Sequence, residues 1–82
     1  MVVVEFDARF EKTFRKIRHE TVRIQLKKQI RKIIENPEVG KPMQHGRRGT
    51  RELYVAPYRL SYAWLEAHGR IILLDLYHKD VQ

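Results

Sequence analysis

Apolar and polar residues alternate along the stretch from Gly49 to Leu65, with one break in the middle. Before the break, Leu53 and Val55 alternate with polar neighbours. After it, apolar side chains again occupy every second position, at Leu60, Tyr62 and Trp64. A period of two is typical of a strand with one buried face. Ala56-Pro57 makes the break, because proline lacks the amide that a paired strand needs. The pattern predicts two strands joined by a tight turn.

The first half of the chain has helical spacing instead. Phe10, Phe14 and Ile17 recur three to four positions apart, which predicts a helix with one apolar face. Asp7 precedes them and is a suitable N-cap, because its carboxylate can accept from the free amides of a first turn. We expect this helix to end near Arg18-His19.

A second helix is predicted to begin at Glu20 or Thr21 and to end at Asn36-Pro37, since a residue before proline is disfavoured in helical conformation. Its apolar stripe consists of Val22, Leu26, Ile30, Ile33 and Ile34. The connection between the two helices is short, so we expect them to be antiparallel.

Two further strands complete the prediction. Val2 to Phe6 has strand propensity, and Arg70 to Asp80 forms the last strand. In the last strand, alternation places Ile72, Leu74 and Leu76 on one face and Ile71, Leu73, Asp75, Tyr77 and Lys79 on the other. The predicted fold class is α+β with the order β-α-α-β-β-β. A helical hairpin covers one face of a small, mostly antiparallel sheet, and the first strand joins an edge or lies beside the last strand.

Length and composition limit the possibilities. At 82 residues, we expect residues 1–82 to form a single domain with a small core. The absence of cysteine excludes disulfides and thiolate metal sites. No apolar run approaches the roughly 20 residues of a membrane span, and the first residues do not resemble a signal peptide. We therefore expect a cytoplasmic protein with no membrane partner.

The chain is basic, with 17 Lys and Arg against 10 Asp and Glu. Such a balance indicates a polyanionic partner, either nucleic acid or an acidic protein; the alternative is a solvated surface with no specific target. A cluster of basic residues falls in or just after the irregular segment from Pro37 to Thr50, where they can reach a phosphate backbone. The candidate RNA-binding residues are Lys41, His45, Arg47, Arg48 and Arg51.

A second group of candidates lies on the sheet face away from the helices. Alternation assigns Glu52, Tyr54, Arg59, Asp75, Tyr77 and Lys79 to this face, and His78 lies at the strand end, where either face is reachable. These side chains suit RNA cleavage, which needs a base for the 2′-hydroxyl, cations for the phosphate and an acid for the leaving oxygen. The alternative is that Arg59 and Asp75 pair across the sheet for structural reasons.

Other site classes are not indicated. The four histidines are scattered, without the spacing of zinc ligands. The chain has no glycine-rich loop of the Walker or dinucleotide-binding type. Ser61 is the only serine, so no serine-based triad is expected. We predict no metal and no cofactor.

Several motifs, in order along nearly all of the chain, resemble the RelE/ParE superfamily of toxins from toxin–antitoxin systems. They are the opening strand with Phe6-Asp7, a basic helical pair ending at Glu35-Asn36-Pro37, the phrase Gly49-Thr50-Arg51-Glu52-Leu53, then Tyr58-Arg59-Leu60-Ser61-Tyr62, and finally Leu74 to Asp80. The resemblance implies the RelE-like fold and a cytoplasmic toxin. Its partner would be a cognate antitoxin, a RelB-like protein with an amphipathic helix.

In RelE-like members the resemblance further implies metal-independent cleavage of mRNA on the ribosome. Arg59 then corresponds to the arginine that contacts the scissile phosphate. Lys79 corresponds to a basic residue near the end of the last strand, which is the proposed acid or charge stabiliser. His78 is similar to a histidine near the C-terminus of other relatives. RelE has lysines where this chain has Glu52 and Tyr54, so Glu52, Tyr54, Tyr77 and His78 all remain candidates for acid, base or base stacking.

Three hypotheses follow from the resemblance. The first is a ribosome-dependent mRNA endonuclease that inhibits translation, with ribosome and mRNA as partners. The second is a ParE-type inhibitor of DNA gyrase, which needs no nuclease site. The third is a catalytically inactive relative that only binds its antitoxin.

Overall fold

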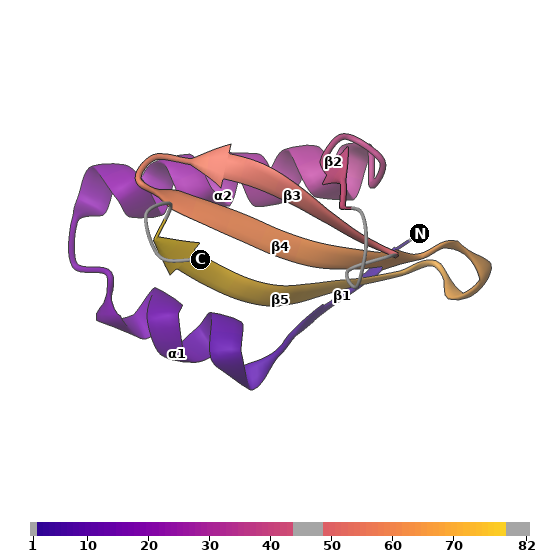
Figure 1. The fold of residues 1–82 in the computed structure, drawn as a ribbon, viewed down its shortest axis with the longest axis horizontal. Helices are drawn as coiled ribbons and strands as arrows, with labels where there is room; N and C mark the ends of the chain where they lie inside the picture. Colours follow the sequence, from indigo (N-terminus) through magenta and orange to yellow (C-terminus); the bar gives the residue numbers. More distant parts are fainter. Residues whose placement is uncertain (1, 44–48, 79–82) are drawn as a thin grey trace.

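One mixed sheet and two helices form the fold (Figure 1). The computed structural model describes residues 2–43 and 49–78. The strands are β1 (Val3–Phe6), β2 (Lys41–Pro42), β3 (Thr50–Val55), β4 (Tyr58–Leu65) and β5 (Arg70–His78), paired in the order β1-β5-β4-β3-β2. β1 is parallel to β5, and all other neighbours are antiparallel. The predicted α+β class is confirmed, and the first strand lies at the edge beside the last.

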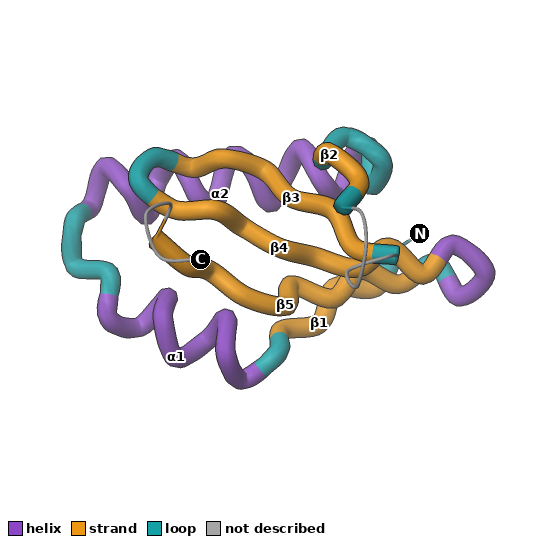
Figure 2. Tube along the Cα trace, in the orientation of Figure 1, coloured by secondary structure: helices purple, strands orange, loops and turns teal. Residues whose placement is uncertain are grey.

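The helices α1 (Ala8–Lys16) and α2 (Glu20–Glu35) run antiparallel on one side of the sheet, with α1 along β5 and α2 behind β3 (Figures 1 and 2). Asp7 is the N-cap of α1, and its carboxylate accepts from the Arg9 amide at 2.8 Å. α1 ends two residues before the predicted Arg18-His19 boundary. α2 begins at Glu20 and ends at Glu35, as predicted from Asn36-Pro37.

The core lies between the helices and the sheet. Its side chains come from both helices, from the C-cap of α1 and from β3, β4 and β5: Phe10, Ile17, Leu26, Ile33, Val55, Leu60, Tyr62, Ile71, Leu73 and Leu76. Alternation in β3 and β4 therefore predicts the buried face correctly at Val55, Leu60 and Tyr62. A single 3-10 turn, η2 (Glu66–His68), leads from β4 into β5, where Gly69 takes a left-handed conformation with φ 59°.

The face assignment for the last strand is wrong in its first half. Ile71 and Leu73 are fully buried, whereas Ile72 and Leu74 are only partly buried. The register between β4 and β5 shifts between Ser61 and Tyr62. A bulge inserts one extra residue in one strand and so reverses the alternation on one side of it. Strict alternation counted back from buried Leu76 therefore assigns the wrong face to the residues of β5 before the bulge.

The segment from Pro37 to Thr50 is more ordered at its start than predicted. It contains the short strand β2, whose Lys41 pairs with Glu52 of β3. Three contacts fix the entry to this strand. The hydroxyl of Tyr62 donates to the Pro37 carbonyl at 2.7 Å and accepts from the Gly40 amide at 2.9 Å, and Arg51 donates to the Gly40 carbonyl at 2.8 Å.

No helix in the described ranges, 2–43 and 49–78, has the length and apolar character that crossing a bilayer requires.

Candidate functional site

The open face of the sheet carries a row of three predicted site residues, one from each central strand. Tyr54 of β3 pairs with Arg59 of β4, and Arg59 pairs with Tyr77 of β5. Directly opposed residues of antiparallel strands have side chains on the same face, with Cβ atoms roughly 4.5–5.5 Å apart. Sheet pairing therefore brings Tyr54, Arg59 and Tyr77 together, although 23 positions separate the first from the last.

Glu52 anchors this row from the neighbouring register position. Its side chain is 5% exposed, which is unusual for a carboxylate. The Tyr77 hydroxyl donates a hydrogen bond to Oε2 of Glu52, and Nη1 of Arg59 lies 3.9 Å from Oε1. A buried carboxylate is stable only when it is paired or hydrogen-bonded. Glu52 thus has a phenol on one oxygen and a guanidinium near the other.

Arg59 remains partly open to solvent. Its side chain is 33% exposed, and its guanidinium carbon lies 6.0 Å from the centre of the Tyr54 ring. Within the described residues, its Nε is buried and makes no hydrogen bond. A guanidinium is a planar donor that binds a phosphate through two nitrogens. Arg59 therefore offers an anion site next to Tyr77.

The predicted alternative, an ion pair between Arg59 and Asp75, does not form. Asp75 accepts a hydrogen bond from the Leu76 amide at 2.8 Å through Oδ1. Glu52 is the carboxylate beside Arg59 instead. The difference arises because Asp75 faces Ser61 in the β4–β5 register, one row away from Arg59.

Two predicted residues lie on the other face. His78 pairs with Tyr58, and their rings are 5.8 Å apart in an edge-to-face contact. Arg51 faces Tyr62 across β3 and β4, and Nη1 donates to the carbonyls of Glu38 at 2.9 Å and Gly40 at 2.8 Å. Arg51 thus holds the segment before β2 against the sheet. Neither His78 nor Arg51 belongs to the row formed by Tyr54, Arg59 and Tyr77.

Lys41 is the remaining predicted cation inside the described residues. It is exposed and lies opposite Glu52 in the register, so its side chain is on the open face beside the site. The predictions for His45, Arg47, Arg48 and Lys79 concern positions outside the described residues.

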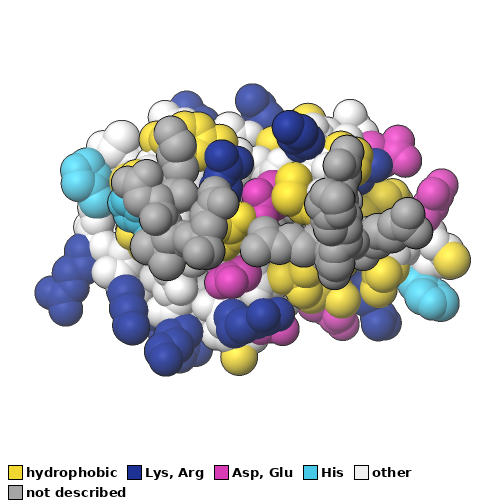
Figure 3. All heavy atoms as spheres, viewed as in Figure 1, with side chains coloured by type: hydrophobic (Ala, Val, Ile, Leu, Met, Phe, Trp, Pro, Cys, Tyr) yellow, Lys and Arg dark blue, Asp and Glu magenta, His cyan; other side chains and the backbone are white. Residues whose placement is uncertain are grey.

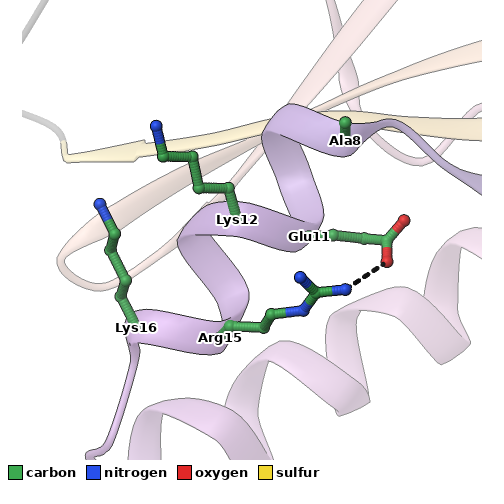
Figure 4. Close-up of a pocket in the computed structure, with 5 residues that line it drawn as sticks. All are labelled: Ala8, Glu11, Lys12, Arg15 and Lys16. Carbon is green, nitrogen blue, oxygen red and sulfur yellow. Dashed lines mark hydrogen bonds and ion pairs between the residues drawn. The ribbon is translucent and has the colours of Figure 1, made fainter.

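Basic side chains also gather along α1, at the edge of the open face (Figure 3). Close up, Glu11 and Arg15 pair at 3.3 Å on the side of α1 toward α2, whereas Lys12 and Lys16 project together toward β5 (Figure 4). With Ala8 these residues line a shallow hollow of about 330 Å³. Sequence reasoning identified a basic helix here but not the sorting of its charges, because that depends on where α1 packs.

An apolar groove between α1 and α2 was missed at the sequence level. It has a volume of about 340 Å³ and is lined by Phe6, Phe10, Phe14 and Ile30, with charged residues at its rim. The three phenylalanine rings follow one another at centroid distances of 5.7 and 5.8 Å. Phe6 is 52% exposed. The sequence indicates this groove only through Phe6, which continues the four-residue spacing of Phe10 and Phe14 back into β1.

Among the residues that the structure describes, no group of three His, Cys, Asp or Glu side chains could hold a metal ion.

Comparisons with known proteins agree with this fold. The chain superimposes on the E. coli RelBE toxin–antitoxin complex with a TM-score of 0.81 and 25% identity, covering 95% of this chain and 96% of that one. An arginine double mutant of E. coli RelE bound to a RelB peptide matches with a TM-score of 0.76 and 26% identity, covering 94% of this chain and 82% of that one. A RelBE complex from Mycobacterium tuberculosis matches with a TM-score of 0.80, covering 95% of this chain and 98% of that one. At 22% identity, this match supports the fold.

No curated protein sequence matches the chain significantly. The family model for ParE toxins of type II toxin–antitoxin systems matches residues 4–81. This match begins within β1 and spans both helices and the other strands of the sheet. The chain therefore belongs to the ParE toxin family of type II toxin–antitoxin systems, within the RelE/ParE superfamily.

Proposed function

We propose that the protein is a toxin that inhibits translation by cleaving messenger RNA on the ribosome. The observation that carries this proposal is the cluster of Arg59, Tyr77 and buried Glu52 on the open face of the sheet. A guanidinium next to a phenol and a carboxylate provides an anion site together with groups that move protons, which is what phosphodiester cleavage requires. The proposed activity would operate in the cytoplasm, where ribosomes are found.

In this proposal, Arg59 holds the scissile phosphate and stabilises the charge that develops on it. The exposed Lys41 adds positive charge on the same face. The resemblance to RelE-like toxins adds Lys79 as a candidate acid, whereas His78 lies on the other face of the sheet. The basic segment before β3 adds His45, Arg47 and Arg48 as candidate contacts to ribosomal RNA. Lys12 and Lys16 extend the basic surface at the edge of the sheet.

Primer extension on ribosome-bound mRNA tests the proposal. The purified protein is added to stalled ribosomes with defined codons in the A site, and cleavage is mapped. We expect Arg59→Ala to lower the cleavage rate about 100-fold or more, the usual loss when a charge-stabilising group is removed. Arg70→Ala is the matched control, because Arg70 is a half-exposed arginine at the start of β5, away from Tyr77, and its partner is Glu5 of β1. Equal cleavage by Arg59→Ala and wild type would overturn the mechanism.

The proposed protein partner is an antitoxin with an amphipathic helix, seated in the groove between α1 and α2. The groove offers half-exposed Phe6 and partly exposed Phe14 and Ile30 to an apolar helix face. Arg15 and Lys27 at its rim favour acidic residues on that helix. The similar E. coli structures were solved with a RelB antitoxin or a RelB peptide bound. A short acidic reading frame adjacent to the toxin gene would encode this partner.

A second candidate function is inhibition of DNA gyrase, as in ParE-type toxins. The match to the ParE family model favours it. It predicts gyrase-dependent double-strand breaks in plasmid DNA and intact mRNA after induction of the toxin. A supercoiling assay with purified gyrase, run beside the primer-extension assay, distinguishes the two functions. A protein inert in both assays would be a relative that only binds its antitoxin.

A further inference from the structure

Lys41 lies in a strand that buries neither of its own residues. β2 consists of Lys41 and Pro42, and both are exposed. The residue before the strand is nevertheless held on both sides. The Gly40 amide donates to the Tyr62 hydroxyl at 2.9 Å, and the Gly40 carbonyl accepts from Arg51 at 2.8 Å. These bonds fix the backbone from which the Lys41 side chain leaves the sheet.

Lys41 and Arg59 lie on the same face of the sheet, two strands apart. Lys41 is opposite Glu52 of β3, and Arg59 of β4 is one register row further along. Neighbouring strands are about 4.8 Å apart and two residues span about 6.8 Å, so the two Cα atoms are roughly 12 Å apart. Among the described residues, none forms an ion pair with Lys41. Because side chains stand nearly perpendicular to a sheet, two cations at this separation suit different phosphates of one strand.

Two carboxylates occupy the register row next to Arg59. Glu52 lies on β3, and Asp75 lies on β5 across Ser61 of β4. Glu52 is buried and Asp75 is partly buried, so both lie beneath any ligand on the face. A phosphate above either carboxylate is disfavoured, because like charges repel. The acids therefore confine the phosphates of a bound strand to the positions of the cations.

A second group of lysines lies on the opposite side of Arg59 from Lys41. Lys12 and Lys16 project from α1 toward β5 (Figure 4), and β5 flanks β4 on the side away from β2. Both residues are exposed, and basic side chains gather along this edge of the face (Figure 3). Arg59 thus lies between Lys41 at one edge of the open face and two lysines at the other.

We propose that a single strand of RNA crosses the open face from α1 to β2, across the strands of the sheet. The scissile phosphate lies on Arg59, and a phosphate on one side of it lies on Lys41. A phosphate on the other side lies on Lys12 or Lys16. This inference rests on the proposed function, which identifies the ligand as RNA. These four cations form an RNA track that positions the strand without reading its bases, because they contact only phosphates.

The salt dependence of RNA binding tests the RNA track without any cleavage. Binding of a short fluorescent single-stranded RNA is measured by anisotropy over a range of salt concentrations. Each lost phosphate contact should reduce the slope of log affinity against log salt by about 0.7. We expect this reduction for Lys41→Ala and for the double variant Lys12→Ala with Lys16→Ala, whereas Lys41→Arg should keep the wild-type slope. Lys28→Ala is the matched control, because Lys28 is an exposed lysine of α2, behind the sheet. A wild-type slope in either alanine variant overturns the track.

Neutral linkages in the mRNA locate the two flanking contacts. A methylphosphonate replaces one phosphate at a time on either side of the cleavage position in ribosome-bound mRNA, and the half-saturating toxin concentration for cleavage is measured. The linkage held by Lys41 should raise this concentration in wild type but not further in Lys41→Ala, because contacting groups are not additive. The α1 double variant should be coupled in the same way to a linkage on the other side of the cut. Coupling of both lysine groups to the same side overturns the track.

Failure of the RNA track and failure of the proposed function give different results. If wild type cleaves ribosome-bound mRNA and Lys41→Ala has the wild-type half-saturating concentration and salt slope, the track is wrong and the nuclease function stands. If Lys41→Ala lowers the rate constant at saturation instead, Lys41 acts on the scissile phosphate and the track is also wrong. If wild type binds RNA with the lysine-dependent slope but leaves the mRNA intact, the nuclease function is wrong and the track stands.

Discussion

The hydroxyl of Tyr62 on β4 accepts a hydrogen bond from the amide of Gly40 at 2.9 Å, although 22 positions separate the two residues. The same hydroxyl donates to the Pro37 carbonyl at 2.7 Å. The Tyr62 side chain is fully buried, so the bond from Gly40 is buried and the bond to Pro37 is partly shielded from water. This one phenol fixes where the chain leaves α2 and where β2 begins, and thereby sets Lys41 beside the candidate site.

The contact makes position 40 intolerant of any side chain. A Cβ on Gly40 would lie 2.7 Å from both the Cε1 and hydroxyl atoms of Tyr62. Overpacking of this kind costs about 1–3 kcal/mol. We therefore expect Gly40→Ala to lower the urea midpoint of unfolding. Val39→Ala, next to it and 39% exposed, should leave the midpoint nearly unchanged.

Tyr62 also gives the fold a dependence on alkaline pH. Burial raises the pKa of the Tyr62 phenol above its usual 10.0. The folded state therefore keeps this proton to higher pH than the unfolded chain does. Its contribution to stability is complete below about pH 10 and declines as pH rises from there toward the folded-state pKa. Urea unfolding between neutral and alkaline pH measures the decline, and Tyr62→Phe should show a shallower one.

Asp7 makes the opposite contribution at acid pH. The backbone hydrogen bond from the Arg9 amide, with the Arg9 side chain, lowers the pKa of the Asp7 carboxyl. The stabilising ionised form is fully present above the unfolded pKa and is lost as pH falls through the folded one. We expect Asp7→Ala to lower the thermal midpoint at neutral pH and to change it little in acid. Asp7→Asn should retain most of the midpoint, because asparagine is also a good N-cap.

Arg23 of α2 closes the C-terminal end of α1. Its Nε donates to the Ile17 carbonyl at 2.6 Å and Nη2 to the Phe14 carbonyl at 3.1 Å, with the guanidinium carbon 4.4 Å from the centre of the Phe14 ring. Carbonyls at a helix end have few backbone partners; among the described residues, the Phe14 carbonyl accepts from the Ile17 amide at 3.2 Å besides Arg23. Arg23→Ala should cost about 2 kcal/mol of unfolding free energy. Arg23→Lys should restore only part, since an ammonium cannot span both carbonyls. Arg31→Ala, on the exposed face of α2, is the control.

The groove between α1 and α2 predicts the effect of Phe6 on antitoxin binding. Phe6 is half-exposed, so its truncation affects the core little, while large aromatic side chains carry much of the energy at interfaces. We expect Phe6→Ala to weaken binding of the antitoxin from the adjacent reading frame at least tenfold by calorimetry. Val39→Ala, an exposed apolar residue outside the groove, should bind as wild type does. Equal affinities for the two variants would remove the groove as the docking site.

Local chemistry was sufficient for many elements of the fold. Asp7 caps a helix wherever apolar spacing follows it, and Asn36-Pro37 ends one, because both effects act through neighbouring backbone atoms. Alternation in β3 and β4 identified the buried side of each strand, and it placed Glu52, Tyr54 and Arg59 on the open face. Each of these features depends only on residues a few positions apart.

The tertiary structure alone decided which side chains meet. The bulge opposite Ser61 and Tyr62 arises from how β4 and β5 pair, so alternation could not place Ile71 and Leu73 in the core. Glu52 on β3 and Tyr77 on β5 are 25 positions apart, so their hydrogen bond depends on how these strands come together. Arg51 and Arg23 look like free surface cations in the sequence, yet both bind carbonyls in the fold. The physical reason is that register and partner choice are set by distant segments, whose approach is not encoded in local periodicity.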